Sequence, residues 1–411
     1  MILDDLVLFD VDGTLVDSAS LWCEATRGAI AEVYAERGVA LPVPDDASLR
    51  AVIGTPARLS LPTLLPKERH DLVPEIAERV RLRASEAMRG KDPPLYAGAR
   101  ECLAELKRRG CGIAIATNAG SRYLDAVLDR LGLRSLVSVA CCLDTPGVTN
   151  KVDMVARALE EVGTRRAVMI GDRAQDREAA HGNGIPFVAF LPGYGSEAEW
   201  DGAEARVRSF EEFLAVLEER GEKIGSLAED LFQRASAKAA ALVVGVTGPL
   251  GAGKTLFADD LARCLRARGA NVETVRLDDF GRPLPGPAEV RSWGDHLAAG
   301  FDLGGFLGAV GFASKRARLE RRGEVGVAIV EGIFLLDERV RGAIDFAIHL
   351  DAREEVLLRR VGTRPDPGVA RLVRDVYLPA HAAFAQSHPP GRLADLVLDN
   401  SNPLRPVRVG E

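Results

Sequence analysis

The chain has 411 residues, a length that predicts two or three domains rather than one. Hydrophobic residues make up 47% and charged residues 27%, which is typical of a soluble globular protein and excludes a disordered or collagen-like chain. The formal net charge of −7 gives no basic excess for nucleic acid or an anionic membrane, and no apolar run reaches the about 18 residues of a membrane span.

The first residues and the cysteines predict a cytoplasmic protein. The chain starts Met1-Ile2-Leu3-Asp4-Asp5, without the basic start and apolar core of a signal peptide. The six cysteines form no CxxC pair and lie in apolar segments. We therefore expect buried thiols in a reducing compartment rather than disulfides or a zinc site.

Strand signals in the first half alternate with helical patterns, which predicts an α/β fold with a parallel sheet. Apolar, β-branched runs occur at residues 6–10, 112–117, 167–171 and 187–190. Residues 18–94 have helical periodicity and few strand signals, and they are too many for a simple crossover. We expect them to form an inserted helical cap.

A second series of strand signals predicts a second parallel sheet, at residues 241–246, 272–277, 327–330, 346–350 and 396–398. The intervening residues 211–240 are charged and alanine-rich, which predicts bridging helices. The expected organisation is a first domain over residues 1–218, a helical linker over 219–240 and a second domain over 241–411.

Acidic pairs follow two strands of the first half. The first strand runs into Asp10-Val11-Asp12-Gly13-Thr14, and the strand ending near residue 170 precedes Asp172 and Asp176. Ligands bind at the carboxyl ends of parallel strands, and clustered carboxylates there favour a hard cation such as Mg²⁺. Each acid alone is better explained by helix capping or solvation, but four acids at strand ends, in order with the threonine and lysine described next, favour a site.

Two further residues complete this first group of candidate site residues. Thr117 ends a strand and offers a hydroxyl for phosphate oxygens. Lys151 follows a loop and offers positive charge to neutralise a phosphate and a carboxylate nucleophile.

The order DVDGT, strand-Thr-Asn, Lys and GDxxxD resembles the haloacid dehalogenase-like hydrolases, over about residues 1–215. The resemblance implies that Asp10 is a nucleophile that becomes an aspartyl-phosphate and that Asp12 is the general acid and base. It implies that Asp10, Asp172 and the main-chain carbonyl of Asp12 hold Mg²⁺, supported by Asp176. Thr117 and Lys151 would bind the phosphoryl group.

An acid at position 12 is what the phosphatases of that family have, and dehalogenases lack it. The segment Val52-Ile53-Gly54-Thr55-Pro56 resembles the cap of phosphoglycolate phosphatase-like members, which close over small phosphorylated metabolites. A phosphomutase shares this cap and stays an alternative. Val152 stands where the family usually has proline after the lysine.

The second half contains a glycine-rich phosphate loop. The predicted strand at 241–246 is followed by Gly248-Pro249-Leu250-Gly251-Ala252-Gly253-Lys254-Thr255 and then a helical pattern, which is the context that GxxxxGK[ST] requires. Main-chain N–H groups at Gly248, Gly251 and Gly253 would surround phosphates, Lys254 would reach the terminal phosphates, and Thr255 would bind Mg²⁺. The alternative is a glycine-rich turn without a ligand.

Carboxylates and arginines follow this loop. Asp278 and Glu331 follow predicted strands, and Arg359, Arg360 and Arg364 lie on and after a helical stretch. With the loop, this order resembles the uridine kinase and phosphoribulokinase family, over about residues 240–400. The resemblance implies a P-loop NTPase fold in which Asp278 takes the proton of an acceptor hydroxyl. Glu331 would hold Mg²⁺ with Thr255, and the arginines would clamp phosphates.

Together the two groups of candidate site residues predict a bifunctional fusion enzyme that uses Mg²⁺ and ATP. A phosphatase would act on a small phosphorylated metabolite, and a kinase would phosphorylate a small alcohol. The alcohol is either a nucleoside or sugar-like, because the 5% of aromatic residues leave few rings to stack on a nucleobase. The alternatives are a phosphomutase, a phosphatase with a regulatory ATP-binding domain, and a non-catalytic scaffold. No nucleic acid or membrane partner is expected.

Overall fold

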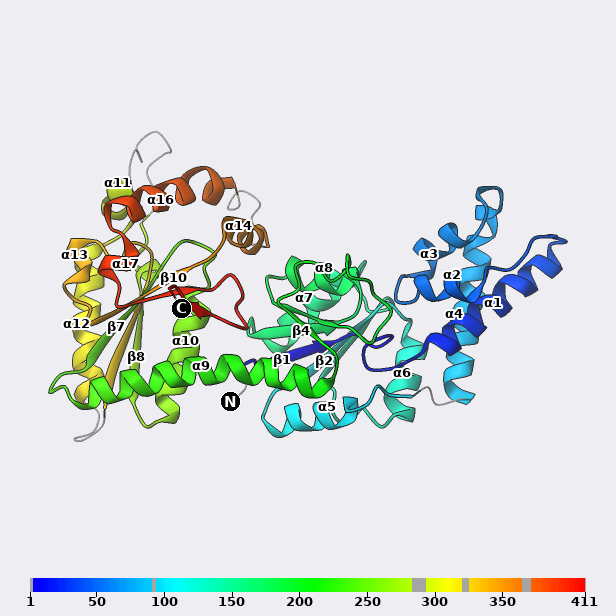
Figure 1. Ribbon diagram of the computed structural model, residues 1–411, viewed down its shortest axis with the longest axis horizontal. Helices are drawn as coiled ribbons and strands as arrows, with labels where there is room; N and C mark the ends of the chain where they lie inside the picture. Colours follow the sequence, from blue (N-terminus) through cyan, green and yellow to red (C-terminus); the bar gives the residue numbers. More distant parts are fainter. Residues whose placement is uncertain (1–2, 91–93, 283–292, 320–324, 364–370, 411) are drawn as a thin grey trace. The chain divides into compact units, whose positions relative to one another are not determined.

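The computed structural model of the chain describes residues 3–90, 94–282, 293–319, 325–363 and 371–410. These residues divide into an N-terminal unit, Ile2–Leu217, and a C-terminal unit, Glu218–Glu411. Within the described ranges, no helix is both long and apolar enough to cross a membrane. Each unit is built on its own sheet (Figure 1).

The N-terminal sheet is parallel and has six strands in the order β3-β2-β1-β4-β5-β6. The strands are β1 Leu6–Phe9, β2 Gly112–Thr117, β3 Val139–Cys142, β4 Ala167–Gly171, β5 Phe187–Phe190 and β6 Ala205–Val207. All four residues of β1 are buried, as a strand covered on both faces requires. The strand order reverses at β1, so the carboxyl end of β1 is the switch point where ligands bind.

Four helices of this unit follow or precede the strands: α5 Ala99–Arg108, α6 Ser121–Arg130, α7 Lys151–Val162 and α8 Ala174–Gly182. Met154 and Ala158 of α7 and Ala179 of α8 pack with β1, β2 and β4 in one core. Against the sheet also lie Phe210 and Phe213, at the start of helix α9 (Phe210–Ser236), whose rings contact Phe9. Apolar side chains thus hold the end of β1 in place.

The segment between β1 and β2 forms a helical cap. Its elements are α1 Ala19–Glu36, α2 Asp46–Ala51, α3 Ala57–Leu64, a 3₁₀ turn Lys67–Leu72 and α4 Val73–Gly90. Ile30 and Val33 of α1, Leu61 of α3 and Ile76 and Val80 of α4 form a core of the cap's own. The cap helices are drawn in blue and cyan in Figure 1.

The C-terminal sheet has six strands in the order β12-β11-β10-β7-β9-β8. They are β7 Leu242–Thr247, β8 Asn271–Arg276, β9 Gly326–Glu331, β10 Phe346–Asp351, β11 Leu396–Asp399 and β12 Val407–Arg408. The five predicted strands pair parallel, as expected, and an additional edge strand, β12, pairs antiparallel with β11. An antiparallel edge strand needs only a short return of the chain.

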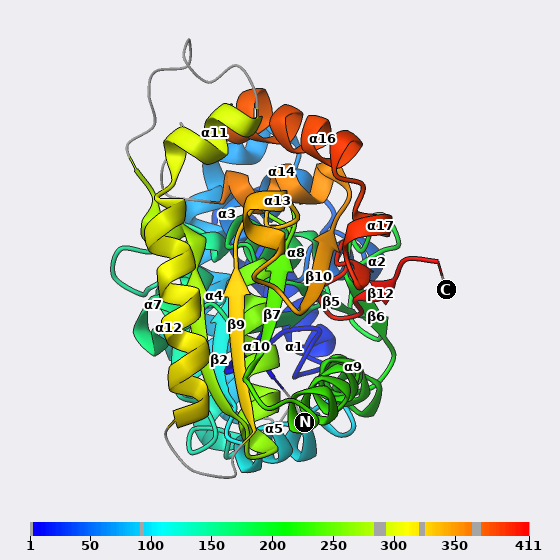
Figure 2. The same ribbon diagram turned by 90° about the vertical axis from the view of Figure 1, so that its left-hand side faces the viewer.

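The remaining helices of this unit are α10 Lys254–Ala267, α11 Trp293–Gly300, α12 Leu303–Leu319, α13 Glu338–Arg341, α14 Glu354–Gly362, α16 Leu378–Ser387 and α17 Pro390–Leu393. Short 3₁₀ and π-helical turns occupy Leu277–Phe280 and Val373–Tyr377. Phe306 and Val310 of α12 pack on Val275 and Ala328, so this helix covers one face of the sheet (Figure 2).

The predicted linker, residues 219–240, falls largely within the single helix α9. Arg220 of this helix is paired with Asp260 of α10 at 2.5 Å, and both side chains are almost fully buried. Most of the segment therefore packs as part of the C-terminal unit, and the domain boundaries given above stay a prediction.

Candidate functional sites

Three buried carboxylates meet at the carboxyl ends of β1 and β4. Oxygens of Asp10, Asp172 and Asp176 all lie within 4.8 Å of one another, and we call this group the carboxylate cluster. Lys151, the first residue of α7, places Nζ 2.7 Å from Oδ1 of Asp10 and 2.5 Å from Oδ1 of Asp176. The parallel sheet thus brings together four of the predicted residues, from positions 166 apart in the sequence at most.

The turn after β1 depends on Gly13. Its φ of +87° is a left-handed conformation that glycine adopts without strain, and a Cβ there would collide with the carboxylate of Asp172. The glycine of the DVDGT motif therefore allows the β1 turn to approach the end of β4.

One ammonium does not balance the charge of three carboxylates. Burial raises the pKa of Asp10 well above its ordinary value, although Lys151 opposes this. Burial, and then the charge of Asp176, raise the pKa of Asp172 to about 7. Burial by itself would lower the pKa of Lys151, but the attraction of Asp10 and Asp176 outweighs this effect. The pKa of Lys151 is therefore above its ordinary value, and the lysine stays charged.

The cluster fits a hard divalent cation. Its donors are all carboxylate oxygens, its charge exceeds that of Lys151, and Oδ2 of Asp10 is buried without a hydrogen-bond partner among the described residues. Such donors are those that Mg²⁺ prefers. The side chain of Asp12 is not part of the group, which leaves its main-chain carbonyl as the expected donor.

Asp172 is held by residues that the sequence analysis did not assign. The main-chain N–H of Tyr194 donates to Oδ2 at 2.7 Å, and the Thr14 hydroxyl donates to Oδ1 at 3.2 Å. The Trp200 indole donates to the main-chain oxygen of Asp172 at 2.7 Å. Thr14 lies within the motif that was found, whereas nothing in the spacing of Tyr194 and Trp200 points to this role.

Asp12 is fixed by two aromatic donors. The Tyr123 hydroxyl and the Trp22 indole N–H donate to its Oδ1 at 2.6 and 2.9 Å. Burial raises the pKa of Asp12, against these hydrogen bonds, which lower it. Tyr123 comes from α6 and Trp22 from α1 of the cap, so the two donors tie Asp12 to both parts of the unit.

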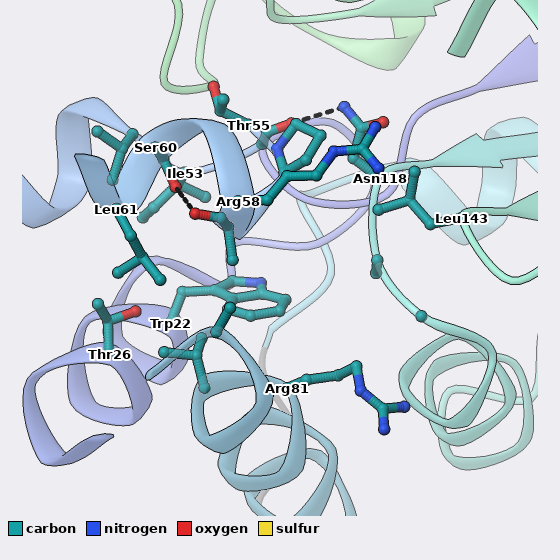
Figure 3. A pocket seen from close by; sticks show the side chains of 18 of the residues that line it. Trp22, Thr26, Ile53, Thr55, Arg58, Ser60, Leu61, Arg81, Asn118 and Leu143 are labelled. Carbon is teal, nitrogen blue, oxygen red and sulfur yellow. Dashed lines mark hydrogen bonds between the residues drawn. The ribbon is translucent and has the colours of Figure 1, made fainter. Parts of the chain in front are cut away.

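A cavity of about 300 Å³ opens onto Asp10, Asp12 and Thr117. Thr117, at the end of β2, is buried and accepts a hydrogen bond from the N–H of Ala119 at 3.2 Å. The rest of the lining comes largely from the cap (Figure 3). The reactive end of the sheet therefore faces a cavity large enough for a small molecule.

In the C-terminal unit, the glycine-rich loop joins β7 to α10. Gly248, Gly251 and Gly253 all have positive φ, and a Cβ on Gly248 would collide with the main-chain oxygen of Leu350. Lys254 begins α10 and donates to the main-chain oxygen of Pro249 at 3.0 Å. The strand order reverses at β7, so this loop too lies at a switch point.

The predicted acidic residues lie at neighbouring strand ends. Thr255 donates to Oε1 of Glu331, the last residue of β9, at 3.2 Å. Burial raises the pKa of Glu331, Lys254 opposes this, and the charge of Asp278 adds to it. Asp278 itself is exposed, on the turn after β8.

The predicted arginines differ in their surroundings. Arg360 of α14 donates to the main-chain oxygen of Gly251 at 3.2 Å and to that of Asn400 at 2.9 Å, so its guanidinium braces the glycine-rich loop. Arg359 lies on the same helix and is half-buried. Arg364 lies outside the described residues.

The part of the chain that resembles known proteins is the one that contains the carboxylate cluster. Residues 7–190 match the family model of the haloacid dehalogenase-like hydrolases. The chain is 32% identical over 195 residues to a phosphoglycolate phosphatase of Xanthomonas campestris, covering 46% of this chain and 83% of that one. It is 31% identical over 196 residues to the tyrosine-protein kinase PtkA of Mycobacterium tuberculosis, covering 46% of this chain and 63% of that one.

Among solved structures, CbbY of Rhodobacter sphaeroides in complex with phosphate is 25% identical, with a TM-score of 0.43. The match covers 51% of this chain and 95% of that one.

Proposed function

We propose that the N-terminal unit, through which this chain belongs to the haloacid dehalogenase-like hydrolase family, is a Mg²⁺-dependent phosphatase for a small phosphorylated metabolite. The observation that carries the proposal is the buried carboxylate cluster, with Lys151 Nζ 2.7 Å from Asp10 Oδ1, beside a cavity of about 300 Å³. The relatives named phosphoglycolate phosphatase support a substrate of this kind.

In this proposal, the reaction proceeds through an aspartyl-phosphate on Asp10. A carboxylate oxygen of Asp10 attacks phosphorus, the bond from phosphorus to the ester oxygen breaks, and Asp12 gives the leaving oxygen its proton. Asp12 then takes a proton from water, whose oxygen attacks phosphorus, and the bond to Asp10 breaks to release phosphate. The raised pKa of Asp12 supports its first role, that of an acid.

The other residues would orient the phosphoryl group and stabilise its charge. Asp10, Asp172 and Asp176, with the main-chain carbonyl of Asp12, would hold Mg²⁺, which supplies positive charge for the phosphoryl oxygens. Lys151 neutralises part of the charge of Asp10 and Asp176, and it would do the same for a bound phosphoryl group.

Phosphate release by the full chain tests this function. We expect wild-type protein to release phosphate from phosphomonoesters with Mg²⁺ and not with EDTA. Asp10→Asn should lower the rate by at least about 10³-fold, because it removes the nucleophile. Asp71→Asn, at an exposed cap aspartate, is the matched control and should leave the rate unchanged. A rate that survives Asp10→Asn would rule out the proposed nucleophile.

For the C-terminal unit we propose ATP binding and phosphoryl transfer to a small-molecule hydroxyl, with a nucleoside or a sugar-like alcohol as acceptor. The observation that favours this is the glycine-rich loop with Lys254 and the Thr255–Glu331 contact of 3.2 Å at the switch point of the sheet. Lys254 would bind the terminal phosphates, and Thr255 and Glu331 would hold Mg²⁺. Asp278 would accept the proton of the acceptor hydroxyl.

ATP binding and ADP formation test this second function separately. Lys254→Ala should weaken ATP binding strongly, whereas Lys223→Ala, at an exposed lysine of α9, should not. Asp278→Asn should abolish transfer but keep ATP bound. If ATP binds and no acceptor from a nucleoside and sugar panel is phosphorylated, the unit is a nucleotide sensor rather than a kinase. If ATP does not bind, the second function is excluded.

A further inference from the structure

The cavity above Asp10 and Asp12 is walled mainly by apolar side chains of the cap. They come from four cap helices and the turn after α2: Trp22 on α1, Leu49 on α2, Ile53 on that turn, Leu61 and Leu64 on α3, and Val80 on α4. Figure 3 shows Trp22, Ile53 and Leu61 gathered at one side of the cavity, with Arg81 apart from them. A wall of this kind gains free energy when an apolar group displaces water from it.

Trp22 connects this wall to the reactive residues. Its indole N–H donates to Asp12 at 2.9 Å, and its ring lies 5.1 Å from that of Tyr123, centroid to centroid. Both contacts fix the plane of the indole, so a rigid flat surface borders the cavity. Rigid aromatic surfaces of this kind bind flat apolar groups with little loss of conformational entropy.

The charged groups that line the cavity offer little to a second anion. Apart from Asp10 and Asp12, the charged residues among the described lining are two arginines, Arg58 and Arg81, and two acids, Glu78 and Asp144. Arg81 is 2.7 Å from Glu78. Arg58 donates to the main-chain oxygen of Thr149 at 3.2 Å. Apart from Asp10 and Asp12, the formal charges of the lining therefore sum to zero, unlike those of a site that selects a carboxylate beside the phosphate.

We propose that the organic part of the substrate is an uncharged, apolar group about the size of a ring, which packs on Trp22 while its phosphate meets Asp10. This inference rests on the proposed phosphatase function and narrows its substrate class. It disfavours a two-carbon acid such as phosphoglycolate, because such a substrate would leave the apolar wall in contact with water and bring a carboxylate into a cavity without excess positive charge.

Binding of two stable analogues tests the substrate class without requiring turnover. Benzylphosphonate and 3-phosphonopropionate carry CH₂ in place of the ester oxygen of phenyl phosphate and phosphoglycolate. With Mg²⁺ and the full chain in a calorimeter, we expect benzylphosphonate to bind at least about tenfold more tightly. Equal affinities, or tighter binding of 3-phosphonopropionate, would overturn the inference.

Two leucines of α3 give a matched pair of variants. Leu64 lines the cavity, whereas Leu59 is 57% exposed and is not among the lining residues. Leu64→Asn should weaken benzylphosphonate binding about three- to tenfold and change 3-phosphonopropionate binding by less than twofold. Leu59→Asn should change neither. Equal loss of both ligands in Leu64→Asn would contradict a role for the apolar wall.

Turnover separates this inference from the proposed function. Wild type should have a kcat/KM for phenyl phosphate at least about tenfold above that for phosphoglycolate. A higher kcat/KM for phosphoglycolate than for phenyl phosphate would refute the inferred substrate class but would still support the proposed phosphatase activity. Preferential binding of benzylphosphonate without release of phosphate from either ester supports the apolar site and refutes the phosphatase.

Discussion

A buried histidine, His349, and a partly buried one, His381, should make the stability of the C-terminal unit depend on pH. His349 of β10 is 3% exposed, and its Nδ1 has no hydrogen-bond partner within the described part of the chain. Its ring lies 5.8 Å from that of His381 of α16, centroid to centroid. Burial, and then the charge of Lys254, lower the pKa of His349 from 6.5 to about 4, and burial lowers that of His381 to about 3.

The direction of the effect follows from these values. Between pH 6.5 and pH 4 the unfolded chain binds a proton at position 349 and the folded chain does not, so stability falls as the pH falls through this window. For His349 alone, the loss between pH 7 and pH 5 is about 2 kcal/mol, since one pKa unit corresponds to about 1.4 kcal/mol. His381 adds to this loss, but not independently, because the two rings are neighbours.

Urea denaturation at a series of pH values measures the effect. Trp293 packs edge-to-face against Phe384 and His388 in the C-terminal unit, so in a background with Trp22 and Trp200 replaced by Phe its fluorescence follows the unfolding of that region. His349→Leu removes one titrating group, and the difference in the free energy of unfolding between wild type and variant isolates it. We expect this difference to change by about 2 kcal/mol from pH 7 to pH 5. A difference that is constant within about 0.5 kcal/mol would refute a buried neutral His349.

Three further predictions concern the N-terminal unit. Lys151→Met leaves the carboxylate cluster without its ammonium group and should lower the free energy of unfolding of the metal-free protein by about 3–5 kcal/mol. In thermal melts, added Mg²⁺ should restore part of the lost stability. Tyr123→Phe removes the hydroxyl that donates to Asp12 at 2.6 Å and should lower the kcat of phosphate release about tenfold or more at unchanged KM. An unchanged kcat would exclude a role of Tyr123 in positioning Asp12. Gly13→Ala places a Cβ against Asp172 at a residue with positive φ, so it should destabilise the N-terminal unit by more than about 1 kcal/mol. It should also weaken Mg²⁺ binding, measured by calorimetry. A variant that binds Mg²⁺ with wild-type affinity would contradict the close approach of Gly13 to Asp172.

Much of the architecture could be predicted from the sequence, because the relevant signals are local. The strands β2, β4 and β5 were predicted at their observed bounds, since buried parallel strands are short apolar runs between turn residues. Three short strands were missed: β3, β6 and β12. The exposed or charged residues within them interrupt the apolar run, and only pairing with a neighbour at the sheet edge makes them strands.

The meeting of Asp10, Lys151, Asp172 and Asp176 also followed from the sequence, since each lies at or just after a strand or helix end and parallel strands end at one edge. Only the tertiary structure decided which residues surround them. Trp22 and Tyr123 are ordinary apolar positions of helices in the sequence, and they become donors to Asp12 because the cap and α6 fold against the same strand end. The apolar wall of the cavity likewise joins side chains from separate cap segments, and no local pattern predicts contacts between residues so far apart along the chain.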